Sequence, residues 1–257
     1  MKKTPRRSKA PGPEKKDAPT TWRLNKYIAH SGVCSRREAA ELVKGGHVLV
    51  NGAVETNPAR EIQAEDVVTC QGKQVKPEVH LVYLLLNKPK NVITTLSDEK
   101  GRNTVHDLLR GKIAERVYPV GRLDRNTTGL LLMTNDGQLA QRLSHPSFRV
   151  RKLYHVKLDR DLTRRDFESI LQGVMLDDGI AEVDSLDFVD QKRDELGIEI
   201  HSGKNRVLRR LFEKLGYEVL RLDRVLYAGL TRKGLPRGHF RHLTTQEVIR
   251  LKHFRQL

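Results

Sequence analysis

The chain has 257 residues, a formal net charge of +16 and a pI of about 10.0. This length allows one large domain or two modest ones with an ample core. No run of about 18 apolar residues occurs, and the N-terminus lacks the apolar core of a signal peptide. We therefore expect a soluble, cytoplasmic protein without membrane contacts. The basic excess favours a polyanionic partner, most simply nucleic acid, over a basic surface that is merely well solvated.

Residues 1–21 are strongly basic, with seven Lys or Arg, two acidic residues, four prolines and almost no large apolar side chains. This composition predicts a disordered arm that adds non-specific affinity for RNA phosphates, although a passive solubilising tail fits equally well. Residues 22–70 carry six charges of each sign, so the remaining excess of +11 lies in residues 71–257. Cys34 and Cys70 form no CxxC pair and have no His cluster nearby, so neither a zinc site nor a disulfide is expected.

Two short helices are predicted after the tail. Apolar residues recur at helical spacing in residues 22–31, and Ser35 starts a second helix with a capping box that Glu38 completes. Short strands are predicted at 47–50 and 66–70. This alternation of small elements indicates a compact N-terminal module.

The stretch RLNKYIAHSGVCSRREAAELVKGGHVLVNG resembles the small RNA-binding module of ribosomal protein S-four. The resemblance covers about residues 22–70 and implies that its helices present a basic face to RNA phosphates. The residues on that face would be Arg23, Lys26, Arg36 and Arg37. Such contacts position RNA without reading its sequence. The alternative is that these are four ordinary solvated helix charges.

The strongest candidate site lies in the stretch PVGRLDRNTTGLLLMTNDG, residues 119–137. A tight turn displays Asp124 in front of a short apolar run at 130–133, which is typical of a buried strand. Arg122 and hydroxyl side chains, Thr127 among them, lie beside it in the sequence. An acidic residue that precedes a buried strand and lies beside an arginine and hydroxyl side chains indicates a functional site. The alternative is a turn-forming aspartate that bonds its own backbone.

The other elements of the second part follow from apolar patterning, turn signals and helix caps. Strands are expected at 81–86 (ended by Asn87-Lys88-Pro89), 149–158, 174–176, 180–190, 196–201 and 217–222, and helices at 105–109, 138–143, 163–172, 206–216 and 244–253. In the strand at 149–158, alternation places Tyr154 with the apolar residues, and by itself this favours a core tyrosine.

Asn205 is expected to cap the helix RVLRRLFEKLG, whose apolar residues define one buried face. Arg206 and Arg210 would lie on the far side, free for solvent or phosphate. Arg209 falls on the shoulder of the apolar stripe, where a half-desolvated arginine requires a carboxylate partner.

Four ordered motifs resemble those of the pseudouridine synthases of the RsuA and RluB/RluE/RluF group. These are LLLNKPKNVITT, GRLDRNTTGLLLMTNDG, RKLYHV and HSGKNRVLRRLFEKLGYEVLRLDR, and the resemblance spans residues 22–257. Asn91 replaces a glycine common after the Lys-Pro pair, although asparagine also tolerates a left-handed turn. Val207 replaces the usual glutamine before the arginine pair.

The resemblance implies a role for each matched residue. Asp124 would be the catalytic carboxylate, Tyr154 would stack on the target base, and Arg209 would pair with Asp124 and keep it ionised. Arg122, Thr127, Leu222 and Lys88 are expected to contact the substrate, and Arg206 and Arg210 the RNA backbone.

The implied reaction breaks the N1–C1′ bond of a uridine, rotates the uracil and rejoins it through C5. Asp124 could act as nucleophile or as base on the ribose, and the sequence does not separate these. The isomerisation involves no redox change or hydrolysis, so no cofactor or metal is expected. Two other classes remain: a non-catalytic RNA-binding ribosome-assembly factor on the same scaffold, and a hydrolase with paired carboxylates that would use Asp136.

The expected fold class is α+β, with a basic tail (1–21), an S-four-like module with linker (22–80) and a catalytic domain (81–257). The catalytic domain should hold a mixed, mostly antiparallel sheet flanked by helices. We expect a monomer that acts on ribosomal RNA, as a stem-loop or an assembly intermediate. The Asn-Lys-Pro turn and the basic extension favour a large-subunit (RluB-like) target, and a small-subunit target is the alternative.

Overall fold

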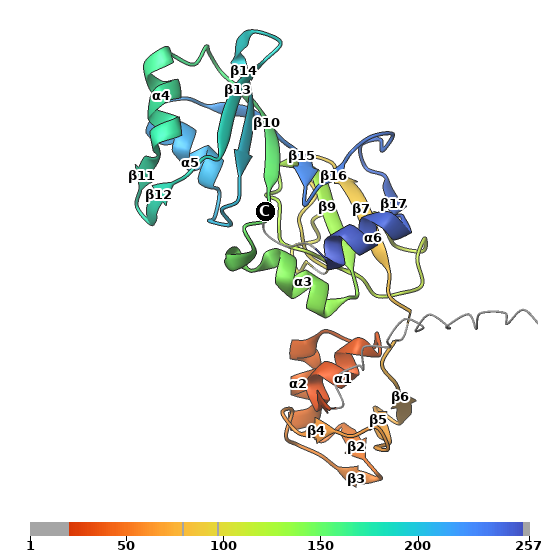
Figure 1. Cartoon of the computed structure of the whole chain (residues 1–257). Coiled ribbons are helices and arrows are strands. Elements are labelled where there is room, and N and C mark those ends of the chain that lie inside the picture. The colour runs from red at the N-terminus through yellow and green to blue at the C-terminus, as the bar shows by residue number, and fades with distance from the viewer. Residues whose placement is uncertain (1–20, 79, 97, 254–257) are drawn as a thin grey trace, which may run out of the picture. The chain divides into compact units, whose positions relative to one another are not determined.

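The computed structural model describes residues 21–78, 80–96 and 98–253, and the chain divides into two compact units, 1–79 and 80–257 (Figure 1). All but the last residue of the predicted basic arm lies outside the described residues. No helix in the described part of the chain is long and apolar enough to cross a membrane.

The first unit pairs two helices with a small antiparallel sheet. Helices α1 (Leu24–His30) and α2 (Arg36–Lys44) pack against one another beside a sheet of order β3-β2-β5-β6. Its strands are β2 (Val48–Val50), β3 (Ala53–Val54), β5 (Val68–Cys70) and β6 (Lys73–Val75), and β1 (Trp22–Arg23) pairs separately with β4 (Glu61–Ile62). The predicted capping box is confirmed, since Glu38 N donates to Ser35 Oγ and Ser35 N donates to the Glu38 carboxylate.

The second unit is built on a nine-stranded sheet whose main order is β13-β14-β10-β15-β9-β7-β17. The strands are β7 (Tyr83–Lys88), β8 (Tyr118–Pro119), β9 (Thr128–Thr134), β10 (Lys152–Leu158), β13 (Ser185–Val189), β14 (Lys192–Ile200), β15 (Val219–Tyr227), β16 (Leu230–Thr231) and β17 (Phe240–His242). Strands β9 and β15 run parallel, and the other pairs in this sheet are antiparallel. The prediction of a mixed, mostly antiparallel sheet is therefore confirmed.

Helices cover both faces of this sheet, which explains the continuous apolar runs of its central strands. In β9, Leu131 and Met133 join the core under α4 (Arg164–Gln172) and α5 (Val207–Lys214). Leu130 and Leu132 face the other core, under α3 (Gly137–Ser144) and α6 (Thr245–Lys252) (Figure 1). A short 3₁₀ turn (Pro146–Phe148) follows α3, and a hairpin of β11 (Val174–Leu176) and β12 (Gly179–Ala181) follows α4.

Four predicted elements differ from the structure. The strand expected at 180–190 is divided between β12 and β13, which belong to different sheets. Residues 105–109 form turns instead of a helix, although Thr104 and Asp107 exchange hydrogen bonds typical of a helix N-terminus. Val105 N donates to Ile93 O in the loop after β7. Strand β15 runs well beyond the predicted end at 222. Helix α5 begins after Arg206, which adopts a left-handed conformation (φ 47°), so Asn205 does not cap it.

Candidate active site

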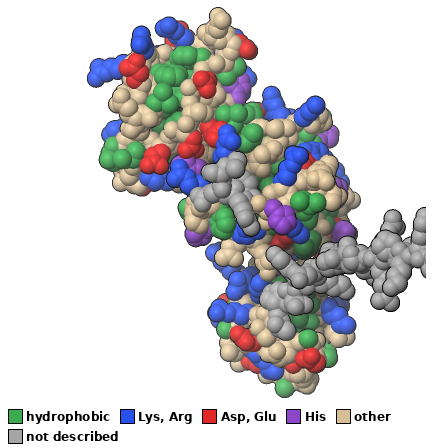
Figure 2. All heavy atoms as spheres, viewed as in Figure 1, with side chains coloured by type: hydrophobic (Ala, Val, Ile, Leu, Met, Phe, Trp, Pro, Cys, Tyr) green, Lys and Arg blue, Asp and Glu red, His purple; other side chains and the backbone are tan. Residues whose placement is uncertain are grey.

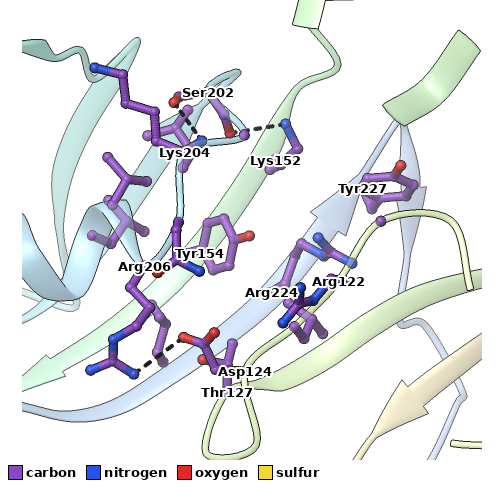
Figure 3. A pocket seen from close by; sticks show the side chains of 18 of the residues that line it. Arg122, Asp124, Thr127, Lys152, Tyr154, Ser202, Lys204, Arg206, Arg224 and Tyr227 are labelled. Atoms are coloured by element: carbon purple, nitrogen blue, oxygen red, sulfur yellow. Dashed lines mark hydrogen bonds and ion pairs between the residues drawn. The ribbon is translucent and has the colours of Figure 1, made fainter. Parts of the chain in front are cut away.

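The floor of the main cavity is one face of the ladder between β10 and β15. The cavity encloses about 440 Å³. In the register of these strands, Lys152 lies opposite Tyr227 and Tyr154 lies opposite Arg224, and all four side chains line the cavity together with Leu222 (Figure 3). A β-bulge after Leu153 places Arg224 and Tyr227, three residues apart, on this same face. Bulges commonly re-aim side chains in this way beside active sites.

Asp124 lies at the rim of this cavity, on the loop between β8 and β9. Its side chain is 31% exposed, and its Oδ2 lies 3.7 Å from Nη1 of Arg206 (Figure 3). Thr127 N donates to Asp124 O at 3.1 Å, which closes the turn that displays the carboxylate. Tyr154 is only 8% exposed, so its ring forms part of the core and of the cavity wall together.

A second loop, which follows β7, holds the Asp124 loop in place. Thr94 Oγ1 donates to Leu123 O at 2.7 Å, and Asn91 N donates to Arg125 O at 2.9 Å. Asn91 has φ 67°, so it adopts the left-handed turn expected of it. These contacts on both sides of Asp124 fix the direction in which its carboxylate points.

Lys88 lies buried between the two loops, with its ammonium bonded to three backbone carbonyls. Nζ donates to Val92 O at 2.7 Å, Pro89 O at 3.1 Å and Arg125 O at 3.4 Å. Burial lowers the pKa of Lys88 to about 8, although the nearby charge of Asp124 opposes this shift. Lys88 was expected to contact substrate, but the structure buries it fully and makes it a support of the Asp124 loop.

The predicted pairing of Arg209 with Asp124 is not found, and Arg206 takes that place. Arg209 Nη1 donates instead to Val219 O at 3.0 Å, at the start of β15. Burial and the charge of Arg206 lower the pKa of Arg209, while the charge of Asp124 raises it, so Asp124 is within electrostatic range. Arg210, expected to be free for phosphate, instead makes two hydrogen bonds to Asp178 at 3.0 and 2.9 Å.

The remaining predicted contacts lie around the cavity. Thr127 and Leu222 are buried and line it, and Arg122 is exposed at its edge. A second cavity of about 580 Å³ shares Arg122, Asp124 and Arg206 with the first and adds Arg125. Asp124 therefore stands between two hollows, both bordered by arginine side chains.

The cavity is also lined by polar side chains to which the sequence patterns assigned no role, chiefly Lys152, Arg224 and Tyr227. Lys152 Nζ donates to His201 O at 2.7 Å and Ser202 O at 3.2 Å, which ties the loop before Arg206 to β10. Burial, followed by the charge of Arg224, lowers the pKa of Lys152 to about 8. The sequence did contain a signal for Lys152, which lies two residues before Tyr154 on the same strand. Alternate residues of a strand share a face, so both side chains were expected on the face of Tyr154.

In the first unit, Arg23, Arg36 and Arg37 are exposed, and none of them makes an ion pair within the described residues. Lys26 is half-buried, with its ammonium 4.5 Å from the ring centroid of Trp22. On the face shown in Figure 2, Lys and Arg side chains occur on both units, interspersed with acidic ones. Arg23, Arg36 and Arg37 are thus accessible to a polyanion.

The fold and the sequence agree with two known families. The chain belongs to the RNA pseudouridylate synthase family, whose model matches residues 82–214, and an S4 domain matches residues 22–68. It is therefore an isomerase, of the RsuA/RluB group with an N-terminal S4 domain.

Among its relatives is the ribosomal large subunit pseudouridine synthase B of Bacillus subtilis, with 42% identity over 90% of this chain and 95% of the relative. The protein of the same name from Vibrio cholerae is 37% identical over 91% of this chain and 75% of the relative. A crystal structure of a pseudouridylate synthase superposes with a TM-score of 0.64 and 25% identity, covering 89% of this chain and 99% of the other.

Proposed function

We propose that this protein converts a uridine of large-subunit ribosomal RNA to pseudouridine, with Asp124 as the catalytic carboxylate. The names of the Bacillus and Vibrio relatives support the large subunit as the target. A modifier of ribosomal RNA works where ribosomes are assembled, so we place its action in the cytoplasm. The S4 unit would hold the RNA through Arg23, Lys26, Arg36 and Arg37 while the second unit performs the chemistry.

The observation that carries the proposal is that Asp124 and Tyr154 line one cavity (Figure 3). A base inside an RNA helix is out of reach of any side chain, so the uridine must leave its stack. The Tyr154 ring offers the flipped uracil a stacking surface that offsets part of the unstacking cost. The ribose of that nucleotide would then face Asp124, whose carboxylate is ion-paired with Arg206.

The atoms balance without an external reactant. The N1–C1′ bond breaks with its electron pair on N1, the uracil rotates, and C5 forms the new bond to C1′. One proton leaves C5 and one is gained at N1. Asp124 can assist as a nucleophile at C1′ or as a base on the ribose, and both routes use the same position at the rim.

The test is incubation of the full chain with unmodified large-subunit and small-subunit rRNA, followed by chemical mapping of pseudouridine. We expect modification at one large-subunit position and its loss in Asp124→Asn, with a fall in rate of at least about 10⁴-fold, as for loss of other essential side chains. Asp187→Asn, at an exposed position on β13, is the matched control and should keep full activity.

Other outcomes identify the rival functions. Modification of the small subunit alone would move the target to that RNA, and activity that persists in Asp124→Asn would remove the aspartate from the chemistry. Release of free uracil would indicate a hydrolase. The candidate second carboxylate of a hydrolase, Asp136, already caps α3 and accepts a hydrogen bond from Tyr83.

A further inference from the structure

Arg224 is a buried cation in the main cavity that has an unused donor. It is 2% exposed, Nε donates to Leu130 O at 2.7 Å, and the guanidinium lies 4.5 Å from the ring centroid of Tyr227. Its Nη2 is buried and has no hydrogen-bond partner. Within the described residues no carboxylate forms an ion pair with Arg224, so its charge is uncompensated at a site where desolvation is expensive.

A second unused polar group lines the same cavity. The hydroxyl of Thr127 is buried, at 2% exposure, and has no partner either. Buried polar groups are almost always hydrogen-bonded, and the exceptions require an explanation. Two such groups in the lining of one cavity indicate that a ligand binds there. Acceptor atoms of that ligand would form the hydrogen bonds that Arg224 and Thr127 lack.

The register of the sheet aims Arg224 at one part of that ligand. Arg224 lies directly opposite Tyr154 across the β10–β15 ladder, and both side chains face the cavity (Figure 3). A base stacked on the Tyr154 ring would therefore present its edge to the guanidinium. The polar groups on the edge of uracil that accept hydrogen bonds are the carbonyl oxygens O2 and O4.

We propose that Arg224 donates through Nη2 to a uracil carbonyl oxygen and stabilises the negative charge that the ring gains as the N1–C1′ bond breaks. This inference rests on the proposed function and names a further catalytic residue for it. The electron pair of the broken bond stays on N1 and is delocalised onto O2 and O4. This negative charge leaves O2 and O4 when C5 forms its bond to C1′. Arg224 only donates a hydrogen bond to the charge, so its guanidinium keeps its proton throughout. A buried donor held in place and aimed at developing charge is an effective arrangement for this purpose.

The test compares the full-length chain and Arg224→Met on two forms of one rRNA fragment, transcribed with uridine or with 5-fluorouridine. The fluorine withdraws electrons and stabilises the departing uracil anion, so departure from this RNA depends less on Arg224. Under single-turnover conditions we expect Arg224→Met to slow loss of uridine on the order of 100-fold. The slowing should be clearly smaller for loss of 5-fluorouridine, measured by chromatography of nuclease digests.

Arg221→Met is the matched control, because Arg221 is exposed on the same strand and should be dispensable on both RNAs. Circular dichroism checks folding, and if Arg224→Met does not fold, Arg224→Lys enters the same comparison. If Arg224→Met slows the loss of uridine and of 5-fluorouridine equally, or slows neither, the proposed role of Arg224 is wrong. The proposed function would still stand, provided that the wild-type chain is active. A wild-type chain that modifies no rRNA would overturn the proposed function, and this inference with it.

Discussion

Lys88 shows how a single charged side chain supports the site from beneath. It is fully buried, and its three carbonyl partners belong to the loop after β7 and to the Asp124 loop. An ammonium group satisfies three acceptors at once, which no neutral side chain of similar shape does. The desolvation that comes with this arrangement lowers the pKa of Lys88 to about 8.

This lowered pKa predicts a particular dependence of stability on pH. Between about pH 8 and the ordinary lysine value of 10.5, the unfolded chain keeps the proton that the folded chain has released. The unfolded state then binds more protons, so the contribution of Lys88 to the free energy of unfolding rises with pH in that window. The rise should approach about 1.4 kcal/mol per pH unit.

The measurement is urea denaturation of wild type and Lys88→Met at several pH values, followed by circular dichroism. The difference between the two free energies of unfolding isolates Lys88, because the other titrating groups are common to both chains. We expect this difference to be constant below pH 8 and to grow in favour of the wild type above it. A difference that stays flat would show that Lys88 titrates normally, and one that shrinks would show that folding raises its pKa.

Arg206 and Arg209 illustrate why helical periodicity misassigned the partner of Asp124. The periodicity placed Arg209 correctly on the half-buried shoulder of α5. Arg206 precedes the helix in a left-handed conformation, so its direction does not follow the helical repeat. The ion pair therefore depends on the left-handed backbone of Arg206. Glycine or asparagine at that position would have predicted this conformation, but arginine does not.

At the scale of elements, the parallel contact between β9 and β15 joins the Asp124 loop to the cavity floor. Gly129 pairs with Arg224 on one side and with Lys88 on the other. A Cβ at Gly129 would lie 2.3 Å from Arg224 O and 2.5 Å from Arg224 N, and its φ is +108°. Only glycine allows the two strands to approach this closely.

Gly129→Ala is therefore expected to destabilise the second unit by at least about 3 kcal/mol, since backbone strain and a steric clash act together. Gly229→Ala is the control, because its φ is also positive (+80°) but no atom lies within 4 Å of its Cβ position. Gly229→Ala should lower the free energy of unfolding by only about 1 kcal/mol. The Tm of each variant from thermal unfolding measures the loss of stability. Equal shifts in Tm for the two variants would contradict the close approach of Gly129 to the backbone of Arg224.

At the scale of the whole molecule, the two units would divide the work of RNA binding and chemistry. Residues 22–70 of the first unit carry six charges of each sign, so we expect the affinity of this part for RNA to come from where the charges lie. Arg36 and Arg37 are adjacent and exposed in the first turn of α2. Phosphate contacts of this kind make binding depend on salt concentration.

The double substitution Arg36→Gln/Arg37→Gln is expected to raise KM for rRNA while kcat stays unchanged. The slope of log affinity against log salt concentration should fall by about 2, one for each lost phosphate contact. Lys73→Gln/Lys76→Gln removes the same charge elsewhere in the first unit and is the control. Filter binding across a salt series measures both, and equal effects of the two pairs would show that only net charge matters.

The sequence by itself determined the class of fold, the order of most elements and the candidate for the catalytic carboxylate. Apolar alternation, helix caps and turn residues are local signals, and a capped helix or a doubly buried strand needs little beyond them. They sufficed to identify Asp124 on its turn, Tyr154 on its strand and the capping box of the first unit.

Tertiary structure alone decided which side chains meet around Asp124. The bulge opposite Tyr154 turns Arg224 and Tyr227 into the cavity. The end of β7 and the loop that follows it bring Lys88 and Thr94 against the Asp124 loop. These contacts join segments distant in sequence, and their geometry depends on strand register and loop conformation. Register and long-range packing are properties of the assembled sheet, which no local pattern specifies.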